Sequence, residues 1–142
     1  MKRLIPFLAV TCAILAASHT AARKAPGQKW ALVVGVSRNQ SLGKLPVCAA
    51  DARAMKKALT EAGYKPDHII LQVDDEEASI GQLPTLGNLK GAVQKLSRVA
   101  GPRDTILLLF SGHGVMRNGQ GHLVPTDGSK NRAVSLQWGK RT

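Results

Sequence analysis

The sequence of 142 residues contains little cysteine, with Cys12 and Cys48 as its two thiols. Cys12 lies in an apolar N-terminal segment that we expect to be cleaved off, so the mature chain keeps Cys48 alone. A single cysteine excludes an internal disulfide. Residues 9–11, which precede Cys12, make a poor lipoprotein signal, so lipidation is not predicted.

Aromatic residues are also scarce: they make up 4% of the chain, whereas 44% of its residues are hydrophobic. A core built from this composition is aliphatic. Acidic residues are few as well, and nine of them against twenty Lys and Arg give a formal net charge of +11. Such a balance can indicate nucleic-acid binding, but the basic residues are dispersed and no aromatic residues are interleaved. They are interpreted as a solvated face plus a basic tail over residues 130–142, and no nucleic-acid partner is predicted.

The N-terminal apolar run, residues 4–17, is too short to span a bilayer comfortably. It follows Lys2 and Arg3 and precedes small residues at positions 20–22, which is the pattern of a secretory signal peptide. We therefore expect a cleaved signal peptide over residues 1–22, a polar linker over 23–28, and no stable membrane span. The protein is expected to be exported from the cytoplasm, to the periplasm or outside the cell. A membrane-anchored N-terminus is the alternative.

Apolar runs and amphipathic stretches alternate along the rest of the chain. Strands are predicted at residues 29–36, 68–73 and 104–110, and helices at residues 50–63 and from Thr85 to a break at Gly101-Pro102. This alternation is typical of an α/β domain with a parallel sheet and right-handed crossovers. Asn118-Gly119 predicts a small hairpin after the last strand.

Several residues in these elements are given structural roles. Asp51 is placed to cap the first helix, and His68 is assigned a strand-edge position without chemistry. The second helix is predicted to bury an apolar stripe of Leu89, Ala92, Val93, Leu96 and Val99. The contiguous acidic run at residues 74–77 lacks the spacing of a calcium loop and is interpreted mainly as a solvated turn.

The last predicted strand leads into Ser111-Gly112-His113-Gly114. An apolar run of this length, bounded by turn residues, predicts a strand buried on both faces of a parallel sheet. Catalytic groups of open α/β sheets gather beyond the carboxyl ends of the strands, and His113 falls there. Its flanking glycines let the backbone approach a substrate closely. The alternative for His113 is a histidine in a tight turn with no chemistry.

Five segments occur in an order and at a spacing that resemble a known family: residues 31–35, 51–55, 62–64, 110–114 and 123–127. They are similar to the large-subunit (p20) half of the caspase-like cysteine peptidases, most closely the metacaspases. The resemblance implies an α/β fold, the caspase-like three-layer sandwich with a mostly parallel sheet and flanking helices. Here the fold is expected to be partial, over residues 29–129, with about three parallel strands and a small hairpin.

The resemblance also implies a cysteine-type endopeptidase with a Cys-His dyad and a peptide or protein substrate. His113 would be the general acid/base toward a cysteine thiolate, and the backbone N–H of Gly114 would help to form the oxyanion hole. No cofactor and no metal ligand are expected, because the calcium site of metacaspases lies largely in a region that this sequence lacks.

A second implied site is the pocket for the P1 side chain. Cys48 and Asp51 match a metacaspase segment whose cysteine and aspartate line the S1 pocket, which implies a basic P1 residue, Arg or Lys. A carboxylate is a good partner for such a side chain. Val47 and Ala50 depart from the family pattern, which has Gly and Asn at these places.

The nucleophile of such a peptidase follows the histidine by about 50 residues, on the next parallel strand. No cysteine follows His113 before Thr142, and Cys48 is not assigned this role because it belongs to a different strand end. We therefore expect a shortened or frame-shifted relative that carries the histidine half only and is inactive alone. The missing strands would leave an open apolar edge that pairs with other chains. The alternative function is a catalytically inactive binding or regulatory module.

Overall fold

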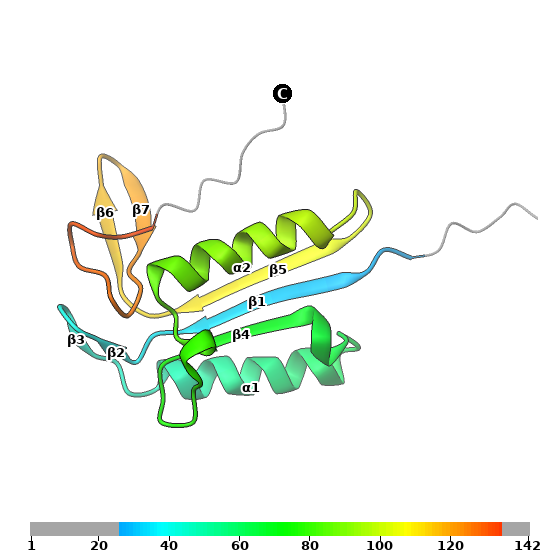
Figure 1. Ribbon diagram of the computed structural model, residues 1–142, viewed down its shortest axis with the longest axis horizontal. Helices are drawn as coiled ribbons and strands as arrows, with labels where there is room; N and C mark the ends of the chain where they lie inside the picture. The colour runs from blue at the N-terminus through cyan, green and yellow to red at the C-terminus, as the bar shows by residue number, and fades with distance from the viewer. Residues whose placement is uncertain (1–25, 135–142) are drawn as a thin grey trace, which may run out of the picture.

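A three-stranded parallel sheet lies between two helices in this protein. The structure is a computed structural model that describes residues 26–134. The sheet has the order β4-β1-β5, built from β1 (Lys29–Gly35), β4 (Ile69–Val73) and β5 (Thr105–Ser111). The helices are α1 (Cys48–Glu61) and α2 (Leu86–Val99), and two short 3-10 helices, η1 (Pro66–His68) and η2 (Ile80–Gln82), precede β4 and α2. Figure 1 shows the helices running along the sheet.

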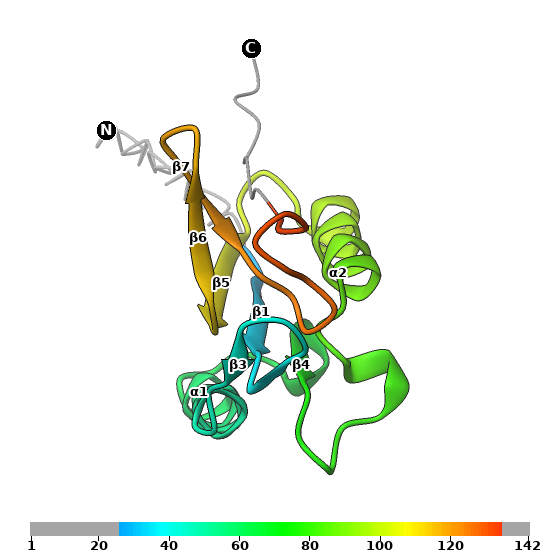
Figure 2. The same ribbon diagram turned by 90° about the vertical axis from the view of Figure 1, so that its left-hand side faces the viewer.

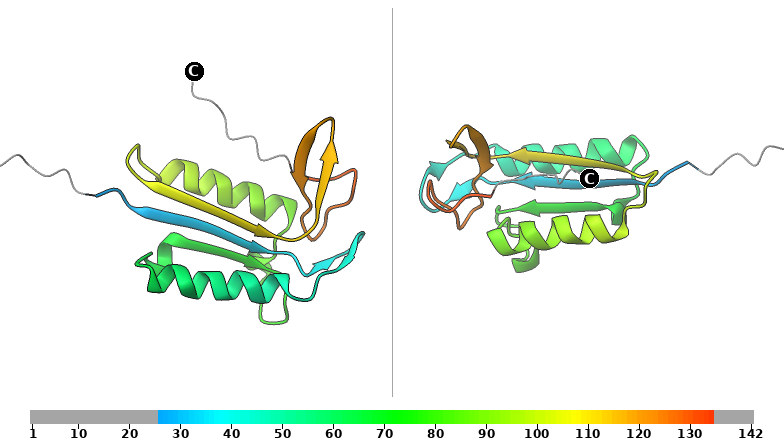
Figure 3. Two further views of the ribbon diagram at one scale, coloured as in Figure 1. Left: turned by 180° about the vertical axis from the view of Figure 1, so that it is seen from behind. Right: turned by 90° about the horizontal axis from the view of Figure 1, so that it is seen from above.

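Two small antiparallel pairs lie at one end of the sheet. They are β2 (Arg38–Asn39) with β3 (Gly43–Lys44), and β6 (Gly114–Arg117) with β7 (Gln120–Leu123). The three parallel strands point to the end where both pairs lie (Figure 3). The segments that follow β1 and β5 therefore gather at the carboxyl ends of the strands.

Strand β1 is buried on both faces, because alternate side chains of a strand point to opposite sides of the sheet. Ala31 and Val33 pack in one cluster with α1, whereas Leu32 and Val34 pack in a second cluster with α2. Figure 2, a view along the strands, shows the two helices on opposite sides of the sheet. The predicted aliphatic layers are thus present in an α/β sandwich.

Strand β5 is less buried than the sequence predicts. Its only sheet partner among the described residues is β1, so its other edge is open. None of its residues is fully buried, and Leu108 is 37% exposed. The prediction of a strand buried on both faces was therefore wrong, whereas the open apolar edge expected from the missing strands is present among the described residues.

The connections place the ends of β1 and β5 side by side. The chain passes from β1 through α1 to β4 on one side, and then through α2 to β5 on the other side of β1. In the resulting register, Gly35 is paired with Ser111. Loops that leave adjacent strands in opposite directions open a crevice at this kind of switch point.

Helix α1 begins at Cys48, two residues before the predicted start, and packs tightly on the end of β1. A Cβ atom at Gly35 would lie 2.3 Å from the carbonyl oxygen of Cys48, so only glycine fits there. The Ser37 Oγ accepts a hydrogen bond from the N–H of Ala49 at 2.8 Å. The prediction that Asp51 caps the helix was wrong, because Asp51 lies inside the first turn, after an N-cap position at Val47.

Helix α2 follows the sequence prediction more closely. The Thr85 Oγ1 accepts a hydrogen bond from the N–H of Asn88 at 3.2 Å, which confirms the predicted cap. Leu89, Ala92 and Leu96 are buried and Val93 packs beside them. Val99 was placed wrongly in the buried stripe: it ends the helix and is 43% exposed.

The acidic run at residues 74–77 is only partly the solvated turn that was predicted. Asp74 is buried, at 5% exposure, and Asp75 is half-buried in an ion pair with Arg53. Glu76 and Glu77 have side chains that are 87% and 81% exposed. The prediction was wrong for the first two carboxylates, because backbone N–H groups and an arginine arrive from segments distant in sequence.

The amino ends of the strands are held by a separate polar cluster. The Asp104 carboxylate accepts hydrogen bonds from the backbone N–H of Gln28 at 2.7 Å and from the Trp30 Nε1–H at 3.1 Å. The indole of Trp30 stacks on His68, with ring centroids 3.8 Å apart. The predicted strand-edge position of His68 was wrong, because this residue ends η1 and β4 begins after it.

The hairpin predicted from Asn118-Gly119 is confirmed as β6 and β7. Both turn residues have positive φ, 50° and 73°, as a two-residue hairpin turn requires. The predicted signal peptide, residues 1–22, and most of the basic tail lie outside the described residues. Within residues 26–134, no helix is both long and apolar enough to cross a membrane.

Substitution of Gly35 by Ala is expected to destabilise the fold by about 3 kcal/mol, because the new methyl overlaps the first turn of α1. Urea unfolding followed by circular dichroism measures the effect. Gly91→Ala is the matched control: no atom lies within 4 Å of its Cβ position, and the change should stabilise α2 by about 0.5–1 kcal/mol. An unchanged midpoint for Gly35→Ala would contradict the close approach of α1 to β1.

Acid is expected to weaken the Arg53–Asp75 ion pair. The hydrogen-bonded Arg53 guanidinium lowers the pKa of Asp75 below its ordinary value of 3.8. The stabilisation is therefore present above that value and is lost as pH falls through the lower pKa of the folded state. Asp75→Asn should lower the melting temperature at neutral pH and flatten its dependence on pH below about 4.

The control for that experiment is Glu76→Gln, which removes a carboxylate of the same turn whose ion pair with Arg38 is exposed. This variant should melt nearly as the unchanged protein does, since exposed pairs contribute little. If Asp75→Asn retained the full acid sensitivity of the unchanged protein, the ion pair would not be its source.

Candidate active site

His113 lies two residues beyond the end of β5, and its side chain contacts β3, in the segment that leaves β1. Its carbonyl oxygen accepts a hydrogen bond from the N–H of Val124 at 3.0 Å. Gly112 is needed before it, because a Cβ there would lie 3.0 Å or less from both Val36 and the Phe110 ring. The backbone of His113 is thus fixed from both sides.

The imidazole of His113 is oriented by a backbone carbonyl. Its Nε2 lies 3.1 Å from the carbonyl oxygen of Gly43 in β3. A carbonyl oxygen only accepts hydrogen bonds, so Nε2 carries the proton of this contact. In the neutral ring, Nδ1 then holds the lone pair, which leaves one basic nitrogen to take a proton from an acidic group.

Gly43 was missed by the sequence analysis, although it is the group that orients His113. A backbone carbonyl leaves no signature in side-chain patterns. The available signal is the glycine itself, which has a positive φ of 96° at the turn of the β2–β3 pair. Positive φ is the conformation that glycine adopts without strain.

Asn39 secures the turn that carries Gly43. Its Oδ1 accepts hydrogen bonds from the N–H groups of Ser41 and Leu42, at 2.9 and 2.6 Å. Its Nδ2 donates to the carbonyl oxygens of Pro125 and Gly128, at 2.8 and 3.1 Å. The buried amide therefore ties the β2–β3 turn to the segment that follows β7.

The N–H of Gly114 points away from β7. Leu123, its partner in the β6–β7 register, exchanges both backbone hydrogen bonds with Val134 on the opposite side. Gly114 and Leu123 therefore form a pair that is not hydrogen-bonded, and in such a pair the N–H groups point outward. Gly114 is also exposed. Its N–H is placed to donate to an oxygen atom that approaches from outside.

An apolar hollow of about 470 Å³ lies beside Gly114. It is formed where the open side of β5 meets the hairpin. Its lining consists of Leu108, Phe110, Gly114, Val115, Met116, Gly121, His122 and Leu123. The hollow thus adjoins the outward N–H of Gly114 and the uncovered part of β5.

The two residues predicted for the S1 pocket lie at the start of α1, at the same end of the sheet as His113. Cys48 is 5% exposed and packs in the core. Asp51 is exposed, and within residues 26–134 no hydrogen bond or ion pair is recorded for its carboxylate. A hollow of about 400 Å³ at the same end of α1 is lined by other residues, Ser37, Arg38, Lys44, Pro46, Ala49, Ala50, Arg53, Asp75 and Glu77, and neither Cys48 nor Asp51 belongs to its lining. No recorded contact joins either residue to His113.

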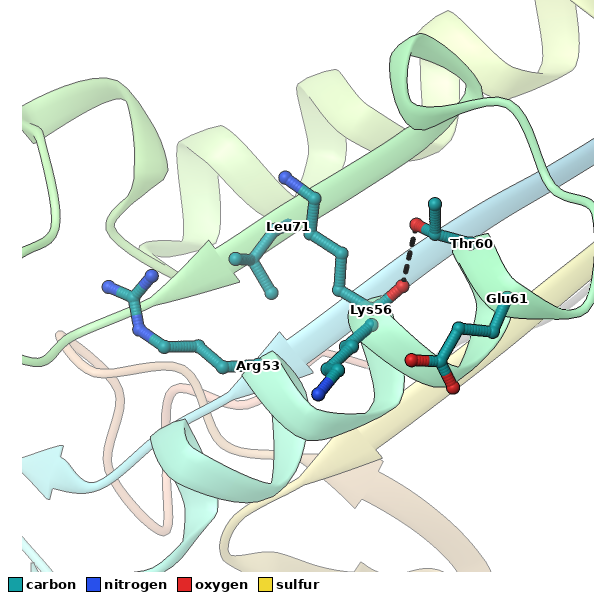
Figure 4. Close-up of a pocket in the computed structure, with 6 residues that line it drawn as sticks. Arg53, Lys56, Thr60, Glu61 and Leu71 are labelled. Atoms are coloured by element: carbon teal, nitrogen blue, oxygen red, sulfur yellow. Dashed lines mark hydrogen bonds between the residues drawn. The ribbon is translucent and has the colours of Figure 1, made fainter.

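A third hollow, of about 410 Å³, lies between α1 and β4. Figure 4 shows Arg53, Lys56, Thr60 and Glu61 of α1 together with Leu71 of β4 around it. None of the predicted site residues lines this hollow. Its arginine is already paired with Asp75, so the third hollow is not part of the candidate site.

Neither a metal ligand set nor an exposed thiol is found among residues 26–134. No three His, Cys, Asp or Glu residues come together there to hold a metal ion. Cys48, the one cysteine in this range, is buried. The arrangement within residues 26–134 therefore places an oriented imidazole and an outward backbone N–H at one end of the sheet, with no exposed thiol beside them.

Known proteins of one family are similar to this chain. Residues 29–135 match the family model of the metacaspase, peptidase C14 domain. The chain is 38% identical over 88 residues to metacaspase-2 of Arabidopsis thaliana, which covers 62% of this chain and 21% of that protein. It is 34% identical over 105 residues to metacaspase-1 of Scheffersomyces stipitis, covering 73% of this chain and 24% of that protein.

Metacaspase-1 of Saccharomyces cerevisiae is 35% identical over 89 residues, which are 62% of this chain and 20% of the yeast protein. The chain thus spans about a quarter or less of the length of these curated relatives. The family match covers all of the parallel sheet, both helices and the hairpin that carries Gly114. The predicted resemblance and the incomplete caspase-like α/β fold are confirmed, and the chain belongs to the metacaspase family of cysteine peptidases.

Proposed function

We propose that this chain provides the histidine-bearing half of a cysteine endopeptidase, with the thiol supplied from outside the described residues. The observation that carries the proposal is the orientation of His113. Its Nε2–H is held on the carbonyl of Gly43, which leaves Nδ1 as the basic nitrogen. An imidazole that is held in one orientation beyond the end of a parallel strand fits the role of a general base better than the role of a structural residue in a turn.

The proposed reaction is acyl transfer through a thioester. His113 takes the proton of the cysteine thiol, and the thiolate attacks the scissile carbonyl carbon. The negative charge that develops on the carbonyl oxygen is stabilised by the outward N–H of Gly114. Such a donor contributes several kcal/mol when it is fixed in advance. His113 then returns the proton to the leaving amine.

The proposed substrate is a peptide with Arg or Lys before the scissile bond. Asp51 supports this choice because its exposed carboxylate has no recorded partner and lies at the same end of the sheet as His113. Cys48 is buried, so its proposed part in the S1 pocket is to shape the wall behind Asp51 and not to bind charge.

The proposal can be tested by joining residues 23–142 to the remaining catalytic portion of a metacaspase relative and following hydrolysis of a fluorogenic peptide with Arg at P1. The joined protein should be active, and His113→Ala should lower kcat about a thousandfold. Asp51→Asn should reduce the preference for Arg over a neutral residue about tenfold or more, the loss of one charged hydrogen bond.

His68→Gln is the control variant, because it changes a histidine at the opposite end of the sheet. It should leave kcat/KM nearly unchanged. Activity that survives His113→Ala would overturn the dyad, and retained Arg preference in Asp51→Asn would overturn the pocket alone.

A second candidate function is suggested by the free edge of β5. Over its seven residues this strand carries no charge and no proline, which are the features that usually protect an edge. We propose that the edge binds an extended apolar strand of a fuller homologue. In this case the chain acts as a regulatory module. It either competes with other strands for the sheet of its partner or completes that sheet.

This binding should depend on the edge and not on the imidazole. Leu108→Lys places a charge on the exposed part of β5 and should weaken binding of a matching strand peptide at least about tenfold. His113→Ala should leave the affinity unchanged. Isothermal titration with the peptide measures both, and loss of binding in His113→Ala would argue against an independent edge site.

A further inference from the structure

We infer that Asp74 is a positioning residue for His113, acting through two separate segments of backbone. The inference rests on the proposed role of His113 as a general base. Asp74 follows the last residue of β4, and β1 separates β4 from β5, so Asp74 does not belong to the strand that carries the histidine. Its carboxylate is nonetheless 5% exposed and is used by the segments that hold the imidazole.

Three hydrogen-bond donors converge on this carboxylate. Its Oδ1 accepts from the N–H of Ser37 at 2.7 Å, and its Oδ2 accepts from the N–H of Arg38 at 2.8 Å. The Thr126 Oγ1 lies 2.9 Å from both Oδ2 and the carbonyl oxygen of Arg38, so these two acceptors share its one proton. The Arg38 guanidinium is paired with Glu76 instead, and no ion pair of Asp74 is recorded within residues 26–134. The buried charge is therefore balanced by N–H and O–H dipoles from two loops.

The first loop leads to the side chain of His113. Arg38 and Asn39 form β2, in register with Lys44 and Gly43 of β3. The carbonyl oxygen of Gly43 accepts the hydrogen bond from His113 Nε2. A carboxylate that fixes the N–H groups at the start of this pair thus sets where the Gly43 carbonyl lies.

The second loop leads to the backbone of His113. Thr126 lies two residues after Val124, whose N–H donates to the carbonyl oxygen of His113. The Thr126 carbonyl oxygen also accepts a hydrogen bond from the N–H of Gln40 at 3.2 Å. The two loops are thereby joined to each other as well as to Asp74, and both supports of His113 meet at one carboxylate.

Position and overall stability can be separated with a pair of variants at Thr126, which is buried. Thr126→Val keeps the shape of the side chain and removes the hydroxyl that joins Asp74 and the Arg38 carbonyl to the second loop, whereas Thr126→Ser keeps the hydroxyl. Asp74→Asn is the more severe third variant. Each is made in the full chain, without a thiol partner or substrate.

The measurement is the exchange with water of the His113 Nε2–H proton, followed by NMR at about pH 8, where an ordinary imidazole is neutral. If Asp74 positions the Gly43 carbonyl, exchange should accelerate about fivefold in Thr126→Val, the factor for one ordinary hydrogen bond. It should accelerate further in Asp74→Asn and stay near the unchanged rate in Thr126→Ser. The Trp30 Nε1–H, bound to Asp104 at the other end of the sheet, is the internal control.

Two outcomes would overturn the inference. Equal exchange rates in Thr126→Val and Thr126→Ser would show that the hydroxyl contact does not set the position of His113. Parallel acceleration at Trp30 in the same variants would show a general loosening of the fold. Because the readout involves neither catalysis nor peptide binding, it fails or succeeds independently of the proposed peptidase function.

Discussion

Strand β1 lies in the centre of the sheet and has a helix on each of its faces, so none of its side chains from Ala31 onward reaches solvent. The rest of the structure is arranged around this constraint. Helix α1 comes so close that Gly35 has no room for a side chain. The backbone that leaves the buried strand still needs hydrogen-bond partners, because unpaired buried N–H groups are costly. Asp74 meets that need at the carboxyl end by accepting from the N–H groups of Ser37 and Arg38, and the Ser37 hydroxyl accepts from the N–H of Ala49 in the first turn of α1.

The candidate site is a result of the same arrangement. Polar groups gather where the buried strands end, and the register of β1 with β5 brings the turn of β2 and β3 close to His113. The imidazole is held by a backbone carbonyl instead of a carboxylate. In the proposed enzyme, a neutral acceptor orients the ring without placing a negative charge beside a base that becomes positive during the reaction.

The elements that follow a clear pattern could be predicted from the sequence: the order of strands and helices, the Thr85 cap, and the Asn118-Gly119 turn. His113 could be found because it stands at the end of an apolar run. The roles of Gly43 and Asp74 could not be predicted from the sequence. Gly43 acts through its backbone carbonyl, and Asp74 acts through loops that lie 36 to 52 residues away along the chain. The open edge of β5 was predicted from the missing downstream strands and not from the apolar run itself, because a sequence pattern does not show which neighbours a strand has.

The supports of His113 that the structure describes come from residues between Ser37 and Gly128. In the proposed enzyme, the base is thus assembled before any thiol is present. Joining the two halves then requires little reordering of the histidine side, so the entropic cost of completing the dyad falls on the segment that carries the thiol. The histidine half is then already in its working geometry. Catalysis begins when the thiol segment binds to it.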